Sequence, residues 1–400
     1  MIGSTRRIIW DTLRLNLGRS TPFRMTLMVS ETCPLRCAIC SIWRNKSPQN
    51  PTLEELEKLL RANPQISWLN LTGGEIFMRS DVHGLFALIA SALPRIALLN
   101  FPTAGQSPRR TVDAVRSGLG TGIPRMLVTV SFDGGCASHD RLRGREGAFE
   151  RARATFGGLR DLARASKGRL AVYPGLTLSR PLLELSPAPL DDLVRDLRLS
   201  GPQEVHLNVA HHSEHYYRNT ADAGSGADES ALRAFAPILH QAWAARSPFR
   251  TDKHAGPPPE PGLGSFSGTP KPAERSLLQR LSLNSMERVY LGNTLEYLAT
   301  GRSPLPCQAL RASVFVDARM TLYPCTIFSR PIADLRQDGY SLANLRIDKR
   351  WRDTRRLITC EQCPGCWTPC EAYSAVLGSL LRPRAVKVLG RLLSDGRHAE

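Results

Sequence analysis

Short apolar stretches alternate with amphipathic ones between residues 25 and 208, and this alternation constrains the fold of the 400-residue chain more than any other feature. The apolar stretches are rich in β-branched residues, and several end in Ser, Thr or Asn. They predict six strands, over residues 25–30, 68–72, 96–101, 126–131, 170–177 and 205–208. Helical patterns lie between them, as at residues 52–62, 146–165 and 191–199, and Thr52 is a candidate N-cap. Six such β/α units predict an α/β fold, a partial (βα)6 barrel.

The remainder of the chain divides by composition. Residues 220–230 are small and polar, and residues 254–272 contain six prolines and four glycines, which excludes a regular helix or strand there. Helical patterns cover residues 231–245 and 273–300. We predict five parts: a basic amphipathic N-terminal arm (1–24), the barrel (25–217), helical segments with a Gly/Pro-rich linker (218–300), a cysteine-rich unit (301–375) and a basic tail (376–400).

Basic residues outnumber acidic ones by 53 to 36, which gives a formal net charge of +17. This charge suits an anionic partner, but the arginines are scattered, so charge alone decides little. The longest mainly apolar run, residues 85–93, is too short to cross a bilayer, and the N-terminus lacks the apolar stretch of an export signal. We expect a cytoplasmic protein. Residues 6–17 and 382–393 interleave basic with apolar residues, so peripheral membrane contact is a further expectation.

Nine of the ten cysteines fall into two groups, and clustered thiols in a chain without an export signal indicate metal sites. The first group is Cys33, Cys37 and Cys40, directly after the first predicted strand. Three thiolates can hold a [4Fe–4S] cluster and leave one iron open to a chelating cofactor. A zinc site with a fourth ligand from elsewhere, or three unrelated cysteines, is the alternative.

Two further motifs follow later predicted strands. Gly73, Gly74 and Glu75 follow the second, where two glycines let the backbone approach a ligand amino group and Glu75 can accept a hydrogen bond. Ser131 and Asp133 follow the fourth, with Arg143-Gly144 downstream, and at spacing i, i+2 they point to one side, as a ribose diol requires.

These three motifs, in this order, resemble the radical S-adenosylmethionine (SAM) superfamily. The resemblance implies SAM bound to a [4Fe–4S] cluster on the first cysteines, with Gly73, Gly74 and Glu75 near its amino group and Ser131 and Asp133 near its ribose. Two positions depart from the family pattern: Ile39 stands where an aromatic residue is usual, and Ile76 where Pro is common. Trp43 lies close enough in sequence to pack on adenine instead.

The second cysteine group follows residue 300 and comprises Cys307, Cys325, Cys360, Cys363, Cys366 and Cys370. CxxC pairs suit a structural zinc site. After a radical SAM core, however, the region resembles the SPASM and twitch domains, which hold auxiliary iron–sulfur clusters. The match is incomplete, because Met320 replaces a Gly and no cysteine follows Cys370. Six thiols suffice for one complete cluster, or for two of which at least one lacks a cysteine ligand.

The resemblance implies an enzyme that reductively cleaves SAM to a 5′-deoxyadenosyl radical, with reduced flavodoxin or ferredoxin as electron donor. The radical abstracts hydrogen from a substrate that the sequence does not identify: lipid-linked, a sugar or other small molecule, or a peptide. Because few residues precede the first predicted strand, we expect the peptide-recognition domain of many SPASM relatives to be absent. His211, His212 and His215, after the sixth strand, are candidate substrate contacts, and Cys136 is a candidate hydrogen-atom donor. The alternative is a zinc-dependent nucleic-acid-binding protein; nucleic acid is not the favoured partner.

Overall fold

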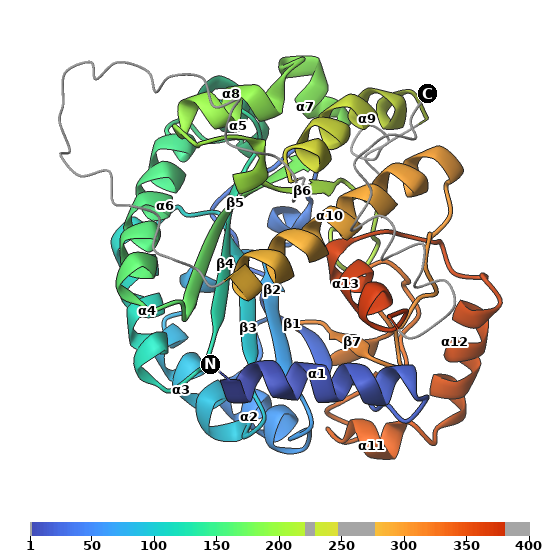
Figure 1. Ribbon diagram of the computed structural model, residues 1–400. Helices are drawn as coiled ribbons and strands as arrows, with labels where there is room; N and C mark the ends of the chain where they lie inside the picture. Colours follow the sequence, from blue (N-terminus) through green and yellow to red (C-terminus); the bar gives the residue numbers. More distant parts are fainter. Residues whose placement is uncertain (1, 221–228, 247–276, 381–400) are drawn as a thin grey trace.

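A computed structural model describes residues 2–220, 229–246 and 277–380, and shows a curled sheet with helices packed around it (Figure 1). Six neighbouring strands run parallel in chain order: β1 (Arg24–Ser30), β2 (Trp68–Gly73), β3 (Leu98–Thr103), β4 (Met126–Phe132), β5 (Leu170–Leu178) and β6 (His206–Val209). Each lies within two residues of its prediction. The sheet is not closed, so the predicted partial barrel is confirmed.

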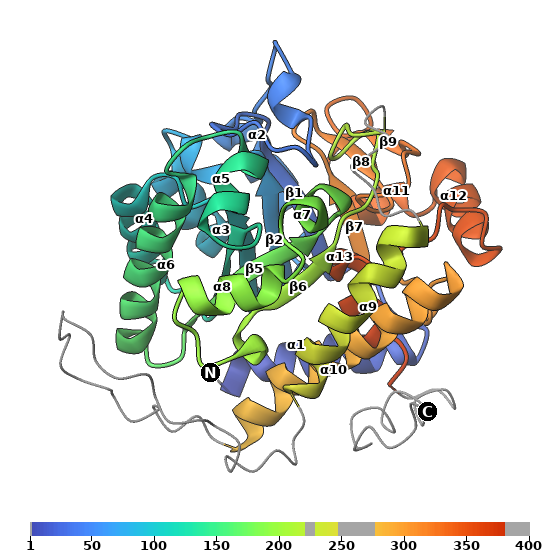
Figure 2. The same ribbon diagram turned by 90° about the horizontal axis from the view of Figure 1, so that it is seen from above.

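Helices cover the outer face of these strands (Figures 1 and 2). They are α2 (Leu53–Arg61), α3 (Val82–Ala92), α4 (Pro108–Gly120), α5 (Cys136–Arg143), α6 (Ala148–Ala165), α7 (Arg180–Leu185) and α8 (Pro189–Asp196). Three short 3-10 turns add η1 (Ile42–Arg44), η2 (Ile76–Met78) and η3 (Pro202–Glu204). The sequence of α2 shows why it forms: Thr52 and Glu55 make a reciprocal capping box, and Leu56, Leu59 and Leu60 are buried on one face. The predicted cap at Thr52 is confirmed.

Alternate residues of the strands separate two environments. Met25, Leu27 and Val29 of β1 join the main hydrophobic core. Between them, Met28 joins a separate small cluster, whereas Thr26 is polar and in register with Asn70 of β2, which is in register with Asn100 of β3. The Asn100 side-chain amide donates to Asn70 Oδ1 at 2.7 Å. The period-2 geometry of a strand therefore gives the barrel an apolar outer face and a hydrogen-bonded inner one.

The cysteine-rich unit continues the same sheet. β7 (Ser313–Val316) pairs in parallel with β1, followed by antiparallel β8 (Thr321–Tyr323) and β9 (Ala333–Asp334). The predicted hairpin over residues 313–322 is present, but its first strand extends the barrel sheet. The remaining helices of this region are α11 (Leu342–Leu345), α12 (Lys349–Thr359) and α13 (Pro369–Leu377).

Three helices complete the described structure: α1 (Ile2–Asn16), α9 (Glu229–Ala244) and α10 (Leu277–Thr300). The helices α9 and α10 pack on one another beside β6 and α13 (Figure 2). Glu287 of α10 contacts both β6 and α13, because its carboxylate lies 2.9 Å from His206 Nδ1 and accepts from the Tyr373 hydroxyl at 2.5 Å. The predicted Gly/Pro-rich linker at 254–272 and most of the basic tail lie outside the described residues. No helix in the described ranges is long and apolar enough to span a membrane.

Candidate functional site

Cys33, Cys37 and Cys40 lie in one loop that leaves the carboxyl end of β1, as predicted. The end of α5 holds this loop from one side: the amides of Arg36 and Ala38 donate to the carbonyls of Arg143 and Leu142 at 3.0 and 2.9 Å. The segment after β6 holds it from the other side. There the Ser41 amide donates to the Tyr217 carbonyl, and the Asn219 side chain donates to the Ile39 carbonyl. The three thiols are therefore fixed by contacts more than 100 residues away in sequence.

Arg143 brings a positive charge to the thiols. Its Nε lies 2.6 Å from Asp133 Oδ2, and its guanidinium donates to Cys37 Sγ at 3.7 Å. Burial raises the pKa of Cys33 to about 11 and that of Cys40 to about 12, while Arg143 acts in the opposite direction on both. Without a metal the thiols are therefore neutral near pH 7. When a bound metal deprotonates the thiols, the positive charge of Arg143 offsets part of the negative charge of the thiolates.

Gly73 and Gly74 bring the end of β2 against the start of the cysteine loop. The Gly74 amide donates to the Ser30 carbonyl at 2.8 Å, and the Glu75 amide donates to the Thr32 carbonyl at 2.8 Å. A Cβ atom on Gly73 would lie 2.1 Å from the Ser30 oxygen, and one on Gly74 would lie 2.3 Å from the Thr32 oxygen. The sequence predicted close approach to a ligand; in the structure the glycines permit close approach between two strand ends.

The Glu75 carboxylate points into the protein and is 3 % exposed. It accepts hydrogen bonds from the Thr103 hydroxyl, the Ala104 amide at 2.7 Å and the Phe77 amide at 3.2 Å. Glu75 thus joins the end of β2 to the end of β3. Its predicted contact with a ligand amino group stays a prediction, and the observed contacts assign it a part in fixing the loops beside the cysteines.

Ser131 and Asp133 stand at the carboxyl end of β4, as predicted. Ser131 is half-buried, and Asp133 is almost fully buried. Only one carboxylate oxygen of Asp133 faces Arg143; Oδ1 is buried and has no hydrogen-bond partner among the described residues. A buried acceptor of this kind suits a hydroxyl donor from a bound molecule.

The three predicted substrate histidines have different hydrogen-bond partners, and their contact with a substrate stays a prediction. His215 is held by Ser329 Oγ at 2.8 Å and the Cys325 carbonyl at 3.0 Å, and it stacks on Tyr323. His211 contacts the Val209 carbonyl and stacks on Tyr297, whereas His212 lies 3.4 Å from the Asn219 carbonyl. Burial lowers the pKa of both His211 and His215 to about 4, so both are neutral. His215 links the loop after β6 to the cysteine-rich unit.

Two other predicted contacts lie at the edge of this region. Trp43 Nε1 donates to the Cys37 carbonyl at 3.4 Å, and Arg36 and Arg44 lie over its ring. Its predicted packing on adenine is not tested. Cys136 is exposed at the start of α5, where its amide donates to Asp196.

Sequence reasoning did not assign the inner-face residues of the barrel or Tyr216. The Tyr216 hydroxyl pairs with Thr72, and its ring packs in a small cluster with Met28 and Cys40. Asn70 and Thr72 occupy alternate positions of β2. The alternation of side chains along a strand could therefore have predicted that both face the barrel interior. Tyr216 comes from a segment without periodicity and held no such signal.

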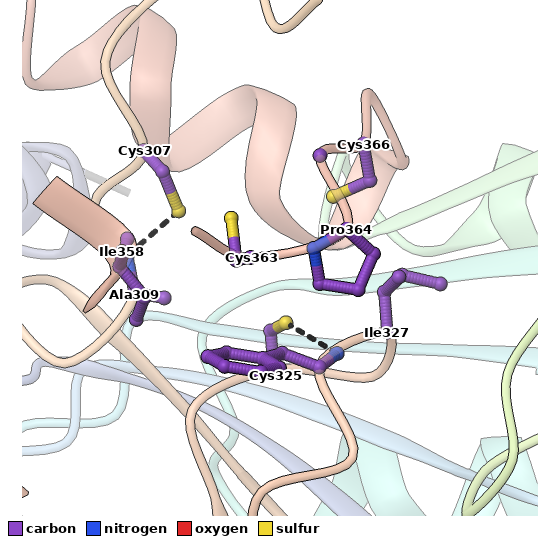
Figure 3. Close-up of a pocket in the computed structure, with 10 residues that line it drawn as sticks. Cys307, Ala309, Cys325, Ile327, Ile358, Cys363, Pro364 and Cys366 are labelled. Carbon is purple, nitrogen blue, oxygen red and sulfur yellow. Dashed lines mark hydrogen bonds between the residues drawn. The ribbon is translucent and has the colours of Figure 1, made fainter. Parts of the chain in front are cut away.

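Four of the six downstream cysteines line one pocket: Cys307, Cys325, Cys363 and Cys366 (Figure 3). They come from the segment before β7, the turn after β8 and the loop after α12. Apolar side chains complete the lining, among them Ile327, Phe328 and Ile358. Two backbone amides point at the sulfurs, from Ala309 to Cys307 at 3.4 Å and from Phe328 to Cys325 at 3.3 Å.

The other two cysteines of this group lie elsewhere. Cys360 is exposed at the end of α12. Cys370 is half-buried, and its sulfur accepts from Asn70 Nδ2, on the inner face of β2, at 3.9 Å. The sequence grouped all six thiols by spacing, whereas the fold gathers four.

Met320, which replaces a Gly of the SPASM pattern, lies in the turn between β7 and β8 with φ +63°. This is the left-handed region that glycine adopts most readily, and a buried Met there is strained. A glycine would adopt this backbone conformation without strain.

Comparisons with known proteins give one family match, in the first half of the chain. Residues 27–186 match the family model of the Radical SAM superfamily. No curated protein matches the chain. One similar solved structure is native anSMEcpe with bound AdoMet, at 12% identity and a TM-score of 0.52; the match covers 92% of this chain and 99% of that one. Another is Streptococcus suis SuiB bound to S-adenosylmethionine, at 13% identity and a TM-score of 0.51, covering 87% and 73%. Residues 27–186 therefore carry a radical SAM domain, and its fold is shared with these proteins.

Proposed function

We propose that this protein is a radical SAM enzyme whose [4Fe–4S] cluster is held by Cys33, Cys37 and Cys40. The observation that carries the proposal is the placement of three thiols in one fixed loop at the end of β1, within the segment that matches the Radical SAM family. Bound and reduced, such a cluster supplies the electron that splits SAM into methionine and a 5′-deoxyadenosyl radical. The three protein ligands leave one iron for the cofactor.

The surrounding residues prepare this site. Arg143 offsets negative charge at Cys37 and holds Asp133 in one orientation. We assign the free Oδ1 of Asp133, together with Ser131, to the cofactor's ribose hydroxyls. Gly73 and Gly74 keep the end of β2 close to the cysteine loop, and Glu75 fixes that turn through Thr103. Preorganisation of this kind keeps the ligands in place before a cofactor arrives.

We further propose an auxiliary iron–sulfur cluster on Cys307, Cys325, Cys363 and Cys366. Four thiols, an apolar lining and two amides aimed at sulfur are the surroundings that such clusters use. A zinc ion would draw four thiolates to about 2.3 Å from one point. A four-iron cluster instead binds each thiolate through a separate iron, so metal analysis distinguishes the two occupants.

The inner face of the barrel indicates the substrate's chemistry. Asn70 accepts from the Asn100 side-chain amide at 2.7 Å, and the Thr72–Tyr216 pair lies further toward the carboxyl end of β2. A substrate entering this interior meets amide and hydroxyl groups, so we propose a polar substrate with several hydrogen-bonding groups. A similar structure is described as SuiB bound to precursor peptide SuiA, at 14% identity and a TM-score of 0.52. A peptide is therefore one candidate beside a sugar.

The test is anaerobic reconstitution with iron and sulfide, followed by metal analysis and incubation with SAM and dithionite. We expect about eight iron atoms per chain, as two four-iron clusters require, and slow release of 5′-deoxyadenosine without substrate. Cys40→Ala should abolish the release, and the exposed Cys136→Ala is the matched control that should retain it. Stoichiometric zinc without iron, and no SAM cleavage, would support the zinc-dependent nucleic-acid-binding alternative. Reduced flavodoxin or ferredoxin can then replace dithionite as the proposed electron donor.

A further inference from the structure

The helix α1 carries apolar residues on two faces, and only one of them is covered. The covered face holds Leu15, which packs with Phe23 and Ala312. On the same side Asp11 accepts from Ser67 Oγ at 2.6 Å and pairs with Arg95 at 2.8 Å. These partners lie one to three positions before β1, β2, β3 or β7, so α1 lies across the amino ends of the strands.

The other face of α1 is open to solvent. Ile9, Trp10, Leu13 and Leu17 are 53, 56, 39 and 66 % exposed, and they are four of the six most exposed large apolar side chains among the described residues. At 3.6 residues per turn these four fall within an arc of about 100°. An apolar stripe of this width on a docked helix normally faces another apolar phase.

Basic residues flank the stripe. Arg6 is exposed near the start of α1 and Arg19 just beyond its end, while the one acidic residue of α1, Asp11, is paired on the covered face. Arg346 donates to the Ser20 carbonyl, four residues beyond the end of α1, so a further cation lies near this end of the helix. Apolar and cationic groups therefore share one surface.

We propose that this face of α1 docks on an anionic lipid surface. Trp, Leu and Ile would enter the interface while the arginines meet lipid phosphates, the arrangement of interfacial helices. Charge favours a lipid over a second copy, because two such faces would bring the arginines of one copy against the arginines of the other. The cysteine loop lies at the opposite end of the strands from α1 (Figure 2). Docking would therefore hold the cofactor end of the barrel away from the lipid, and it does not depend on the proposed chemistry.

The test is sedimentation of the full chain with vesicles of phosphatidylcholine alone and with phosphatidylglycerol added, at low and physiological salt. We expect binding only to the mixed vesicles, weakened by salt. Trp10→Ser with Leu13→Ser should weaken it more than tenfold. Replacement of Arg6 and Arg19 by Ser should weaken it roughly fivefold per residue. The matched control, Arg109→Ser with Arg141→Ser, removes the same charge from exposed positions elsewhere.

Three outcomes would overturn the proposal. The first is no binding to the mixed vesicles at low salt. The second is an equal loss in the Arg109 and Arg141 control, which would reduce the effect to bulk charge. The third is a wild-type dimer, detected by light scattering, that Trp10→Ser with Leu13→Ser converts to a monomer; the occupant of the face would then be a second copy of this chain.

Discussion

The two cysteine sites are built in opposite ways. At the carboxyl end of β1, three thiols come from eight consecutive residues and the fold supplies only their supports. In the second site, four thiols come from segments up to 59 positions apart, and the fold itself brings them together. A local site can be recognised from spacing alone. A site assembled from distant segments can be recognised only as a group of candidates.

The largest effect should separate the two sites by function. Replacing Cys33, Cys37 and Cys40 with Ala should remove about half of the iron. It should also reduce SAM cleavage more than roughly 100-fold, because mutating residues that only contact metal ligands already costs roughly 10–100-fold. Cys363→Ala with Cys366→Ala should remove the other half, abolish substrate turnover and spare SAM cleavage. Iron analysis measures cluster content, 5′-deoxyadenosine release measures SAM cleavage, and product formation measures substrate turnover. If a well-folded Cys363→Ala, Cys366→Ala protein loses both activities equally, the two sites do not have separate roles.

The difference between the sites also explains how far the sequence could predict this structure. All six barrel strands were predictable, because their apolar periods and polar ends are local signals. The pairing of β7 with β1 was not, because no local pattern distinguishes a new sheet from the continuation of an old one.

The same distinction holds for side chains. Cys33 and Gly74 were predicted from motifs, whereas the contact of Arg143 with Cys37 spans 106 positions. The predicted contact of His215 with substrate is not tested, but its partners Cys325 and Ser329, more than 100 positions away, were not predictable from the sequence. Spacing could not tell Cys360 and Cys370 from the four pocket cysteines either.

The second prediction concerns the local site. Gly74→Ala would place a methyl group 2.3 Å from the Thr32 carbonyl oxygen, which rigid backbone on both sides cannot accommodate. We expect a loss of about 3 kcal/mol in unfolding free energy and weaker cluster retention at the first site. Chemical denaturation and iron analysis measure these. Gly120→Ala is the control: nothing lies within 4 Å of a Cβ there, so it should be neutral or slightly stabilising. Equal stability of the two variants would contradict the close approach.

The third prediction concerns Glu287 of α10, which connects β6 of the barrel to α13 of the cysteine-rich unit. Burial would raise the pKa of Glu287, but His206, Arg246 and Tyr373 together lower it to about 2. Because the folded pKa lies below the unfolded value of about 4.3, this stabilisation is complete above that pH and is lost as the pH falls toward 2. Glu287→Gln should cost about 2 kcal/mol at pH 7 and less at pH 3. Unfolding curves at the two pH values check it, and a pH-independent cost would exclude the ionised carboxylate as the cause.

The smallest effect should come from the cysteines that spacing included and the fold left out. Cys360 is exposed at the end of α12 and does not line the pocket, so Cys360→Ala should retain full iron content and change unfolding free energy by less than about 0.5 kcal/mol. Cys363→Ala, three residues on in the same motif, should lose the auxiliary iron. The pair distinguishes a cluster with the four pocket ligands from one that rearranges to recruit Cys360 when iron binds. Loss of iron in Cys360→Ala equal to that in Cys363→Ala would mean that the ligand set follows the spacing of the motif, and that the pocket reshapes on loading.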